Sequence, residues 1–562
     1  MSSSVLNLNV GILGHVDSGK TSLAKALSTT ASTASFDKNP ESQVRGITID
    51  LGFSSLLLDM PQHLKNLCSE EKLQLTLVDC PGHASLIRTI IGGAQIIDLM
   101  ILVVDVTKGM QTQTAECLVI GEVTCQKMIV VLNKTDLLPE GKRTALIDKM
   151  TKRMKLTLAN SVFKDAPVVS VAANPGGSEG VQSSLPVGLQ DLTETLQKFA
   201  FVPERHILSP FLFAVDHCFG VRGQGTVMTG TVLQGAVNVN DTVEIPSVHV
   251  TKKVKSLQMF RRPVERAVQG DRIGICISQF DPNQLERGIV CMPGYVPAIS
   301  SAIISVQKIK YFKGSLSTKA KFHISIGHET VMAKLSFFSL LQDSRNTAND
   351  NSFDFDKEYK FQEELLFDSQ KDDTSITAKE MPVKQFALLE FEKPVLAFPN
   401  CLIIGSKLDT DIHTNTCRLA FWGHLLEGIE DKSYSSTVLP RLKIYKEKCK
   451  SGIIDRASNQ YEVIGKNMFK KETNIQLFVG LQVELSTGET GIIESSFGQS
   501  GKVKIRIPDG LNESTYELLS GMTKRKGKQT QPQNTSPDPE PIKIALHFKR
   551  YIYDPKKKMV QS

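Results

Sequence analysis

The chain has 562 residues, and its 66 basic and 59 acidic side chains give a formal net charge of +7. Hydrophobic residues make up 41% and charged residues 22%, which excludes a wholly disordered or fibrous chain. No run of about 18 apolar residues is present, so the sequence predicts no membrane-spanning helix. Its beginning lacks the features of a secretory signal, and we expect about three to five domains in the cytoplasm, with the nucleus as a second compartment.

Residues 1–203 alternate between predicted strands and predicted helices. Short apolar, β-branched runs predict buried strands, and the segments between them have the periodicity of helices. This alternation is typical of an α/β domain whose parallel sheet is covered on both faces. The predicted strands are 5–14, 73–78, 100–104, 128–132 and 167–171, and the predicted helices are 21–30, 84–93, 112–122 and 141–159.

The rest of the chain has closely spaced strand patterns and glycine-containing turns, which predict β-barrels. We expect one barrel at 208–297, a second at 301–436 and a mostly-β domain at 441–562. Residues 341–380 hold 11 acidic and 5 basic side chains, and we expect a flexible acidic insertion there. In the last domain we expect strands at 475–479, 491–495, 502–507 and 542–548, and a disordered segment at 521–540.

The first predicted strand runs into a phosphate-binding motif of the form G-x-x-x-x-G-K-[ST]. Its position between a strand and a helix suits the chemistry, because backbone N–H groups and the helix N-terminus can then surround a phosphate. We expect Lys20 to reach the β- and γ-phosphates and the Thr21 hydroxyl to bind Mg²⁺. The motif consists of Gly14, His15, Val16, Asp17, Ser18, Gly19, Lys20 and Thr21.

The sequence Asp-Cys-Pro-Gly-His follows the predicted strand at 73–78. An acidic side chain at a strand end can hold Mg²⁺ through water, which is the role we expect for Asp79. Gly82 allows its backbone N–H to approach a γ-phosphate, and His83 can position the attacking water. Taken alone, His83 fits a solvent-exposed turn histidine equally well.

The sequence Asn-Lys-Thr-Asp follows the strand at 128–132 and predicts a guanine site. The Asp136 carboxylate can pair with the N1–H and the exocyclic amino group of guanine, a donor pair that adenine lacks. We expect Asn133 to hydrogen-bond the other edge of the base and the stem of Lys134 to stack on the ring. A backbone N–H after the next strand can bind the guanine O6, from Ser170, Val171 or Ala172.

Residues 45–50, Arg-Gly-Ile-Thr-Ile-Asp, lie between the phosphate-binding motif and Asp79. Thr48 in this segment can complete the Mg²⁺ shell only when a γ-phosphate is present. We therefore expect the segment to order with GTP and to loosen after hydrolysis. These four motifs in this order predict a P-loop GTPase.

The same motifs resemble those of the translational GTPases. GHVDSGKT, RGITID, DCPGH and NKTD are spelled as in elongation factor Tu and its relatives. VDHCFGVRGQGTVMTGTV, HTNTCRLAFWG and FKKETNIQLFVGLQV are similar to the eukaryotic selenocysteine-specific elongation factors. The resemblance implies a multidomain fold, in which an α/β P-loop GTPase domain is followed by β-barrel domains and a C-terminal mostly-β domain.

The resemblance also implies a ribosome-stimulated GTPase whose ligands are GTP, GDP and Mg²⁺. Thr21, Thr48 and Asp79 would serve Mg²⁺, Gly82 would contact the γ-phosphate and His83 would orient the water. The implied function is delivery of selenocysteinyl-tRNA to ribosomes at UGA codons, with GTP hydrolysis as the release switch. The implied partners are this tRNA, the ribosome, and a selenocysteine-insertion RNA element with its binding protein, and the chain would act as a monomer away from membranes.

Three residues match the amino-acid pocket of this family: Asp216 and His217 in VDHC, and Arg272 in GDRIG. Spacing alone would make them a turn histidine and a salt bridge at a barrel edge. The resemblance implies instead that they hold the selenocysteinyl group. A selenol is more acidic than a serine hydroxyl and is anionic at neutral pH, so His217 and Arg272 can favour it by charge.

Residues 441–562 hold 22 basic and 13 acidic side chains, a net charge of +9. A local basic excess suits RNA, and aromatic residues among the cations suit unpaired bases. The alternative is that the aromatic residues, Tyr445, Phe469, Phe548, Tyr551 and Tyr553, form barrel core. The candidate RNA-facing charges are Lys443, Lys446, Lys448, Lys450, Lys470, Lys471, Lys502, Lys504, Arg506, Lys549 and Arg550.

Two other functions fit parts of the sequence. One is a GTPase that delivers initiator tRNA, but that family often carries a cysteine-rich zinc element, and none of the ten cysteines here forms a Cys-x-x-Cys pair. The other is a GTP-regulated scaffold for RNA or ribosomes. His83 and the matched aminoacyl pocket count against the scaffold.

Overall fold

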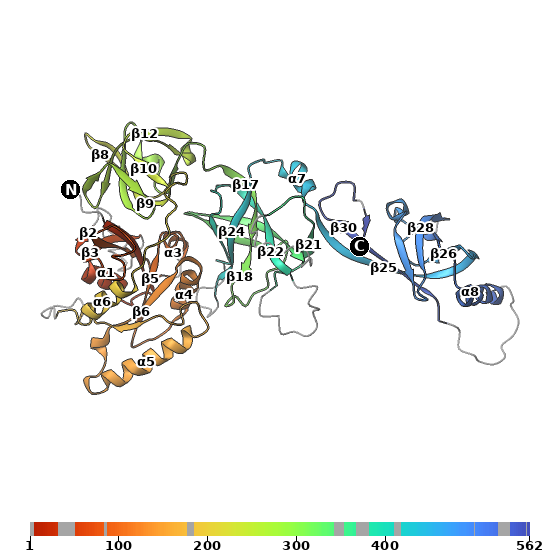
Figure 1. Cartoon of the computed structure of the whole chain (residues 1–562), viewed down its shortest axis with the longest axis horizontal. Coiled ribbons are helices and arrows are strands. Elements are labelled where there is room, and N and C mark those ends of the chain that lie inside the picture. Colours follow the sequence, from red (N-terminus) through yellow and green to blue (C-terminus); the bar gives the residue numbers. More distant parts are fainter. Residues whose placement is uncertain are drawn as a thin grey trace. The chain divides into compact units, whose positions relative to one another are not determined.

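The structure is a computed structural model, and it describes residues 5–31, 51–83, 87–176, 185–341, 353–366, 382–409, 417–498, 501–526, 540–557 and 559–562. The chain divides into two compact units (Figure 1). The first contains Met1–Ser336, Glu364–Lys371 and Ala387–Asp431, and the second contains Phe337–Glu363, Asp372–Phe386 and Lys432–Ser562. Among the described residues, no helix has the length and apolar character needed to cross a membrane.

The first unit begins with a seven-stranded sheet in the order β2-β3-β4-β1-β5-β6-β7. Strand β3 is antiparallel to both of its neighbours, whereas β4, β1, β5, β6 and β7 run parallel. Parallel strands end at one edge of a sheet, so the segments that follow β1, β4, β5 and β6 converge there. The strands are β1 (Val5–Gly14), β2 (Thr30–Ala31), β3 (Gly52–Asp59), β4 (Lys72–Asp79), β5 (Leu99–Asp105), β6 (Lys127–Asn133) and β7 (Val168–Ser170).

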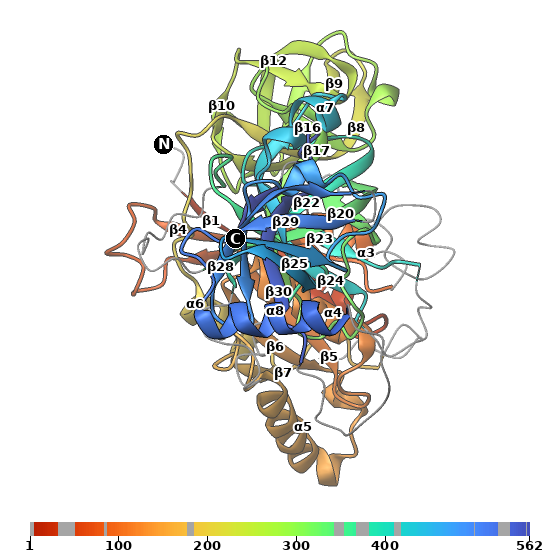
Figure 2. The same ribbon diagram turned by 90° about the vertical axis from the view of Figure 1, so that its right-hand side faces the viewer.

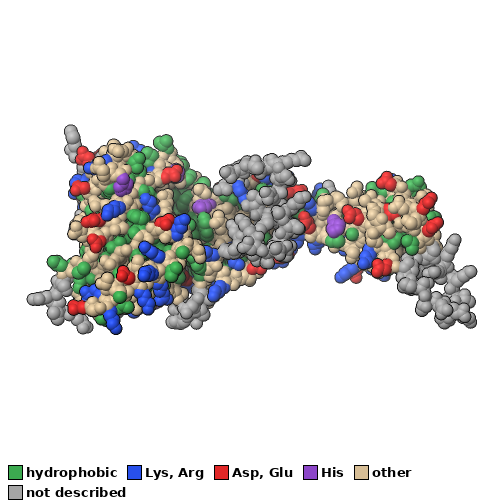
Figure 3. All heavy atoms as spheres, turned by 60° about the horizontal axis from the view of Figure 1, so that its bottom comes forward, with side chains coloured by type: hydrophobic (Ala, Val, Ile, Leu, Met, Phe, Trp, Pro, Cys, Tyr) green, Lys and Arg blue, Asp and Glu red, His purple; other side chains and the backbone are tan. Residues whose placement is uncertain are grey.

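Helices cover both faces of this sheet. Leu8, Val10 and Ile12 of β1 pack against α1 and α6, and α3 and α4 pack on the opposite face. The outer side of α5 is polar, and basic side chains are frequent on this part of the surface in Figure 3. The helices are α1 (Lys20–Leu27), α3 (Ile87–Ala94), α4 (Thr112–Thr124), α5 (Arg143–Leu158) and α6 (Leu189–Phe199).

A closed barrel follows, which we call the first barrel. Its strands run in the order β11-β16-β8-β9-β15-β12, and β12 pairs with β11 to close the sheet. Phe213, Val215, Met228 and Ile275 are among the side chains that fill its interior. The strands are β8 (Leu212–Val221), β9 (Gly225–Gln234), β11 (Thr242–Ile245), β12 (Val250–Met259), β15 (Arg272–Ile277) and β16 (Gly288–Cys291), with short strands β10 (Ala236–Asn238), β13 (Arg262–Val264) and β14 (Arg266–Val268).

A second barrel completes the first unit. Its strands run in the order β19-β23-β24-β17-β22-β20, and β20 pairs with β19. A buried ion pair ties this barrel to α4, because Arg418 donates from Nε and Nη2 to the two carboxylate oxygens of Glu116, at 2.9 and 2.8 Å. The strands are β17 (Ala298–Ser305), β18 (Gln307–Lys308), β19 (Lys321–Ile326), β20 (Glu329–Leu341), β22 (Pro382–Leu396), β23 (Leu402–Ser406) and β24 (Leu419–Ile429).

The second unit contains a third barrel. Its strands run in the order β25-β26-β29-β28-β27-β30, and β30 pairs back with β25. Helix α8 packs beside β25 (Figure 2). The elements are β21 (Tyr359–Gln362), α7 (Tyr434–Thr437), β25 (Ile444–Asn459), β26 (Glu462–Lys466), β27 (Gln482–Leu485), β28 (Thr490–Phe497), β29 (Lys502–Arg506), α8 (Glu513–Lys526), β30 (Lys543–Tyr551) and β31 (Met559–Gln561).

Three sequence expectations for this unit are wrong where the structure describes the residues concerned. The expected flexible insertion at 341–380 contains strand β21, because the aromatic side chains of that stretch pack into a cluster. The expected strand at 475–479 is a 3₁₀-helix, Ile475–Phe478, whose three-residue repeat buries both of its end residues. The expected disordered segment at 521–540 begins inside α8, and residues 527–539 lie outside the described residues, as do 342–352 and 367–381.

Candidate functional site

The phosphate-binding motif forms the turn between β1 and α1. Gly19 has a φ of 87°, in the left-handed region that favours glycine, and a Cβ there would lie 2.2 Å from Nδ2 of Asn133. A Cβ on Gly14 would lie 2.3 Å from the carbonyl oxygen of Val103. Both glycines are therefore needed for a turn close enough to present backbone N–H groups at the start of α1.

Lys20, the first residue of α1, places a buried cation at this turn. Its side chain is 6% exposed, and Nζ donates a 2.6 Å hydrogen bond to the carbonyl oxygen of His15. Nζ also lies beside Gly82, because a Cβ on that glycine would be 2.3 Å from it. Burial lowers the pKa of Lys20, and the charge of Asp79 opposes this shift. A buried ammonium group next to a helix N-terminus attracts phosphate strongly, since little water screens it.

Thr21 and Asp79 meet beside the same turn. Thr21 Oγ1 donates a 2.7 Å hydrogen bond to Oδ2 of Asp79, which ends β4 and is 1% exposed. A hydroxyl and a carboxylate oxygen next to a phosphate-binding turn are the hard oxygen donors that Mg²⁺ prefers, so this pair fits the ion. Thr48, the third expected ligand, lies outside the described residues.

The turn after Asp79 packs directly on the phosphate-binding motif. A Cβ on Gly82 would lie 3.0 Å from the backbone nitrogen of Val16. Burial and then the charge of Lys20 lower the pKa of His15, and His83 adds a smaller effect in the same direction. His83 is half-buried and lies near His15, so it is not an isolated, solvent-exposed turn histidine.

The expected guanine-binding segment follows β6. Lys134 adopts a φ of 64°, and its Nζ forms a 2.9 Å ion pair with Oδ2 of Asp105 at the end of β5. This pair fixes the direction of the lysine stem. Asp136 is half-buried, and its Oδ2 accepts a long hydrogen bond of 3.4 Å from the backbone N–H of Gly176.

Asn133 makes backbone contacts that the sequence did not predict. Its Nδ2 donates to the carbonyl oxygen of Ser18 at 2.9 Å, and its Oδ1 accepts from the backbone N–H of Ala173 at 3.1 Å. The side chain is 2% exposed. Both ends of the amide thus engage protein backbone and form a brace, while the expected contact of the second Nδ2 hydrogen with the base stays a prediction. This brace holds the phosphate-binding turn against the segment of Ser170, Val171 and Ala172.

The expected aminoacyl pocket lies on the outer face of the first barrel. Arg272 and Asp216 form an ion pair, and their residues are only 4% and 5% exposed. Spacing alone suggested a salt bridge at a barrel edge, but the structure buries this pair. Thr231 lies opposite Arg272 in the β15–β9 register, and Oγ1 of Thr231 is 3.5 Å from Arg272 Nη1.

A β-bulge brings Asp216 and His217 to the same site. His217 lies opposite Thr229 of β9. Thr229 and Thr231 are two residues apart in this strand, so their side chains lie on the same face of the barrel. Phe213 and Val215 fill the barrel interior, so in a regular strand Asp216 would face outward and His217 inward, but the register shifts between Val215 and His217. Asp216 is the extra residue of this bulge, and the bulge turns the side chain of His217 to the outer face that carries Asp216 and Arg272.

Two polar atoms of this pocket are buried without a hydrogen-bond partner among the described residues. They are Nη2 of Arg272 and Oγ1 of Thr229. An unpaired buried donor on a charged group is costly, and a bound anion would satisfy it. The guanidinium is also covered by Phe53 of β3, whose ring centroid lies 3.3 Å from the Arg272 Cζ.

Sequence reasoning missed several residues of this site. Phe53, Thr229 and Thr231 were not singled out, although both threonines lie in the VDHCFGVRGQGTVMTGTV stretch, because their proximity to Arg272 depends on strand register and on how the sheet meets the barrel. His328, between β19 and β20, lies near this ion pair: burial lowers its pKa, the charge of Asp216 opposes this, and the charges of Arg287 and Arg272 add to it. His328 also lines a cavity of about 270 Å³ together with Arg88, Thr89, Ser247 and Arg287, but none of Asp216, His217 and Arg272 lines it.

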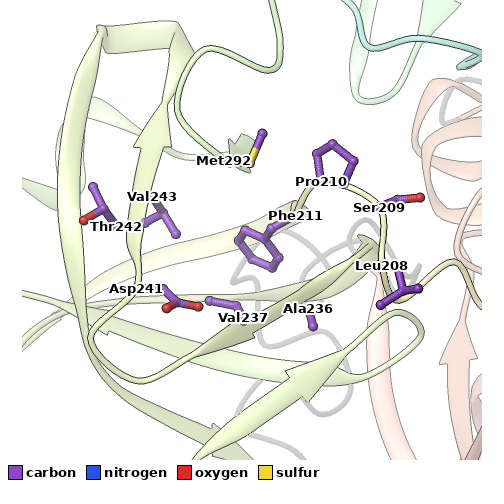
Figure 4. A pocket seen from close by; sticks show the side chains of 10 residues that line it. All are labelled: Leu208, Ser209, Pro210, Phe211, Ala236, Val237, Asp241, Thr242, Val243 and Met292. Carbon is purple, nitrogen blue, oxygen red and sulfur yellow. The ribbon is translucent and has the colours of Figure 1, made fainter.

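A separate hollow of about 400 Å³ opens on the first barrel (Figure 4). The ring of Phe211 lies at its centre, between Val237 and Val243. Asp241 is the one charged residue among those that line it, and its Oδ2 already accepts from the backbone N and Nδ2 of Asn238, at 2.7 and 3.0 Å. This hollow therefore offers apolar contact and little polar recognition.

The candidate RNA-facing residues of the second unit divide into two groups. Several are engaged in ion pairs, including Lys502 with Asp455 and Lys504 with Glu462 and Glu494. Lys448, Lys470, Lys471 and Arg506 are exposed, whereas Lys450 and Arg550 are half-buried. Lys443, Lys446 and Lys549 also form ion pairs.

The aromatic residues of this domain are mostly core. Phe469 and Phe548 are 6% and 1% exposed and pack around Phe478, and Tyr445 is 6% exposed. The expectation that these three stack on unpaired bases is therefore wrong, and the alternative that they form barrel core is confirmed. Tyr551 and Tyr553 are half-buried.

Fold and site together define a P-loop GTPase of the elongation factor Tu type. Family models match consecutive parts of the chain: the elongation factor Tu GTP binding domain (residues 6–211), elongation factor Tu domain 2 (225–292), the third domain of eukaryotic selenocysteine-specific elongation factors (303–423) and the eEFSec C-terminal RIFT domain (440–557).

Relatives that match over nearly the whole chain point to the same family. The chain is 56% identical to the selenocysteine-specific elongation factor of Mus musculus, with 99% of both chains covered, and 31% identical to that of Methanocaldococcus jannaschii, with 93% and 99% covered. The apo crystal structure of translation elongation factor SelB from Methanococcus maripaludis matches with a TM-score of 0.63 at 25% identity, over 98% of this chain and 99% of that one. The same factor with a GTP analogue gives 0.65 at 24% identity, over the same shares, and shows the same fold.

The chain therefore belongs to the selenocysteine-specific elongation factors, and it is a GTP-binding GTPase. This membership decides against the initiator-tRNA alternative.

Proposed function

We propose that this protein carries selenocysteinyl-tRNA to the ribosome at UGA codons and uses GTP hydrolysis to release it. The observation that carries the proposal is the buried Asp216–Arg272 pair, whose Arg272 Nη2 is an unsatisfied donor on the outer face of the first barrel. Such a donor suits an anionic ligand group. Among aminoacyl groups that resemble serine, only the selenol is anionic at neutral pH.

Selectivity for the selenocysteinyl over the seryl group would come from the negative charge of the selenolate. A hydrogen bond from a guanidinium to an anion is roughly twice as strong as one between neutral groups, and the low local dielectric strengthens it further. Serine would leave Arg272 facing a neutral hydroxyl. Asp216 keeps the guanidinium oriented, and His217 supplies a second donor on the same face.

The nucleotide site supports the hydrolytic step. Lys20 and the backbone of the phosphate-binding turn hold the phosphates, and Asp136 selects guanine. Thr21 and Asp79, with Thr48 from outside the described residues, would hold Mg²⁺, which when bound neutralises phosphate charge. His83 orients the attacking water from its position beside the turn.

Phe53 can couple the state of the bound nucleotide to the position of Arg272 in the aminoacyl pocket. It lies in β3, which follows the 45–50 segment, and its ring covers the Arg272 guanidinium. When hydrolysis frees Thr48 from the γ-phosphate, a shift of this segment would move Phe53 and alter the position of Arg272. Loss of GTP would thereby weaken the hold on the amino acid.

The remaining partners follow from the family and are part of the same proposal. The exposed cations of the C-terminal domain, such as Lys470 and Lys471, suit contact with ribosomal or messenger RNA, including a selenocysteine-insertion element and its binding protein. A monomeric state and a cytoplasmic location with a nuclear fraction stay predictions.

The test is the affinity of the full chain for selenocysteinyl-tRNA, measured with a non-hydrolysable GTP analogue and with GDP. We expect tight binding only with the analogue, and Phe53→Ala should narrow the difference between the two states. The same affinity in both states would refute the release switch. A chain that binds the tRNA in neither state would favour the scaffold alternative.

A further inference from the structure

A short stretch of the second unit places its carboxylates next to lysines in and just before β25 and in β30. We call residues 354–363 the acidic segment. It contains β21, which pairs in parallel with β25, so that Tyr359 lies opposite Ile444 and Lys360 opposite Tyr445. On its other side β21 pairs with β20, so the acidic segment lies between β20 and β25, the strand that carries several of the candidate RNA-facing lysines.

An aromatic cluster fixes the backbone of the acidic segment. Tyr359 is 2% exposed, and its ring centroid lies 5.3 Å from Phe338 and 5.1 Å from Phe353. Phe353 in turn lies 5.9 Å from Phe386. Aromatic packing of this kind does not depend on charge, so the carboxylates can be neutralised while the segment stays in place.

Glu358 makes the most ordered contact. Its Oε2 accepts a 2.7 Å hydrogen bond from Lys549 Nζ, and its other oxygen accepts one from the Tyr551 hydroxyl. These two hydrogen bonds lower the pKa of Glu358, so the carboxylate is ionised at neutral pH. Lys549 also lies over the ring of Tyr445, 4.4 Å from its centroid.

Glu363 and Asp356 occupy two further lysines. Glu363 pairs with Lys446, whose Nζ lies 3.8 Å from the ring centroid of Phe361. Lys443 Nζ donates to the carbonyl oxygen of Asp356 at 3.0 Å and lies 3.7 Å from its carboxylate. The Asp356 and Glu363 side chains are 95% and 79% exposed, so each pair is weak and easily exchanged.

We propose that the acidic segment is an internal competitor for RNA. Its carboxylates occupy Lys443, Lys446 and Lys549, which an RNA phosphate backbone would otherwise contact. This inference rests on the proposed RNA-binding role of the C-terminal domain. A strand that offers several phosphates at once displaces the weak pairs, whereas a single anionic contact does not, so the acidic segment lowers the affinity of the domain for RNA without blocking it.

The test compares the full chain with the variant D356N/E358Q/E363Q, using a fluorescein-labelled single-stranded RNA of mixed sequence and fluorescence anisotropy. Each exposed pair is worth a factor of roughly two, so the variant should bind about tenfold more tightly at low salt. Three freed lysines should also steepen the slope of log affinity against log salt by about 2, because each phosphate contact on a single strand contributes about 0.7.

The matched control is D509N/E484Q/E517Q, which changes the charge of the same unit equally. These three side chains are exposed and form no ion pair within the described part of the unit. A second control is K443A/K446A/K549A, alone and combined with the first variant. If the lysines receive the RNA, the combined variant should lose the gain.

Equal gains in RNA affinity in the two charge-matched variants, or a gain that survives removal of the three lysines, would overturn the proposal that the acidic segment competes with RNA. Failure of the wild type and of every variant to bind the RNA would instead overturn the RNA-binding role of the domain. Circular dichroism checks that each variant retains the native fold. A variant that unfolds is replaced by E358Q alone, for which an increase of about twofold is expected and no increase refutes the inference.

Discussion

The brace formed by Asn133 leads to a quantitative prediction for the variant Asn133→Ala. In the wild type this amide donates to the Ser18 carbonyl and accepts from the Ala173 N–H, and the side chain is 2% exposed. Alanine would leave both backbone groups buried and unpaired. Each such group costs about 1–3 kcal/mol, so we expect a local loss of about 2–4 kcal/mol after partial relaxation.

Hydrogen exchange of the nucleotide-free full chain measures this loss directly. The amide of Ala173 reports the broken bond, and Val171, which donates to Leu132, reports the neighbouring backbone. A loss of 2–4 kcal/mol corresponds to a roughly 30- to 700-fold fall in protection, at 1.4 kcal/mol per factor of ten. Amides of the first barrel, such as Ile275 in β15, should be unchanged.

Nucleotide affinity should fall for GTP and GDP alike, because the phosphate-binding turn itself loosens. Asn160→Ala is the control, since Asn160 has an exposed side chain. If Asn133 acted only on the base, protection in the nucleotide-free chain would be unchanged and only nucleotide affinity would fall. That result would refute the brace.

Two further predictions concern buried and half-buried charges. Arg418→Met should destabilise the second barrel by about 3–5 kcal/mol, because it leaves Glu116 charged and buried without its partner. Urea unfolding, followed by the fluorescence of Trp422, the only tryptophan, measures this loss, and adding Glu116→Gln should recover part of it. Hydrogen bonds from Lys502 and Lys466 lower the pKa of Asp455 to about 2, so the stability that the Asp455 carboxylate contributes is present above pH 4 and lost as the pH falls towards 2. Asp455→Asn should therefore cost about 1 kcal/mol at pH 7 and almost nothing near pH 2, as measured by hydrogen exchange of β26 and β29. A cost that stays constant with pH would exclude the ion pairs of Asp455 as its cause.

The nucleotide site was largely predictable because its geometry is local. Gly14, Lys20, Thr21 and Asp79 lie at the ends of parallel strands or the start of a helix, and those ends meet at one edge of the sheet. The brace by Asn133 was not predictable, since an amide that follows a strand can face either the base or the backbone. Only the distances to Ser18 and Ala173 reveal the backbone contacts.

The aminoacyl pocket shows where sequence reasoning ends. The family resemblance identified Asp216, His217 and Arg272, but strand alternation alone would separate the first two. The bulge that unites them, and the ring of Phe53 that covers Arg272, depend on contacts between elements far apart in the chain. No periodicity in the sequence encodes such contacts.

The part of the acidic insertion that the structure describes, residues 353–366, was misjudged because composition averages over a segment. Its excess of carboxylates predicted flexibility, yet Phe353, Phe355 and Tyr359 within it supply enough apolar surface to order β21. A shorter window centred on these aromatic residues would have indicated a packed stretch. The carboxylates then serve as partners for lysines rather than as a solvated tail.

The most direct test of the account is equilibrium binding of selenocysteinyl-tRNA and of the same tRNA carrying serine, with the full chain loaded with a GTP analogue. The wild type should prefer selenocysteine by about tenfold or more, because a charge-assisted hydrogen bond exceeds a neutral one by about 1–2 kcal/mol. Arg272→Ala should abolish this preference and His217→Ala should reduce it, with serine binding little changed. Equal binding of the two tRNAs by the wild type would contradict the anionic pocket.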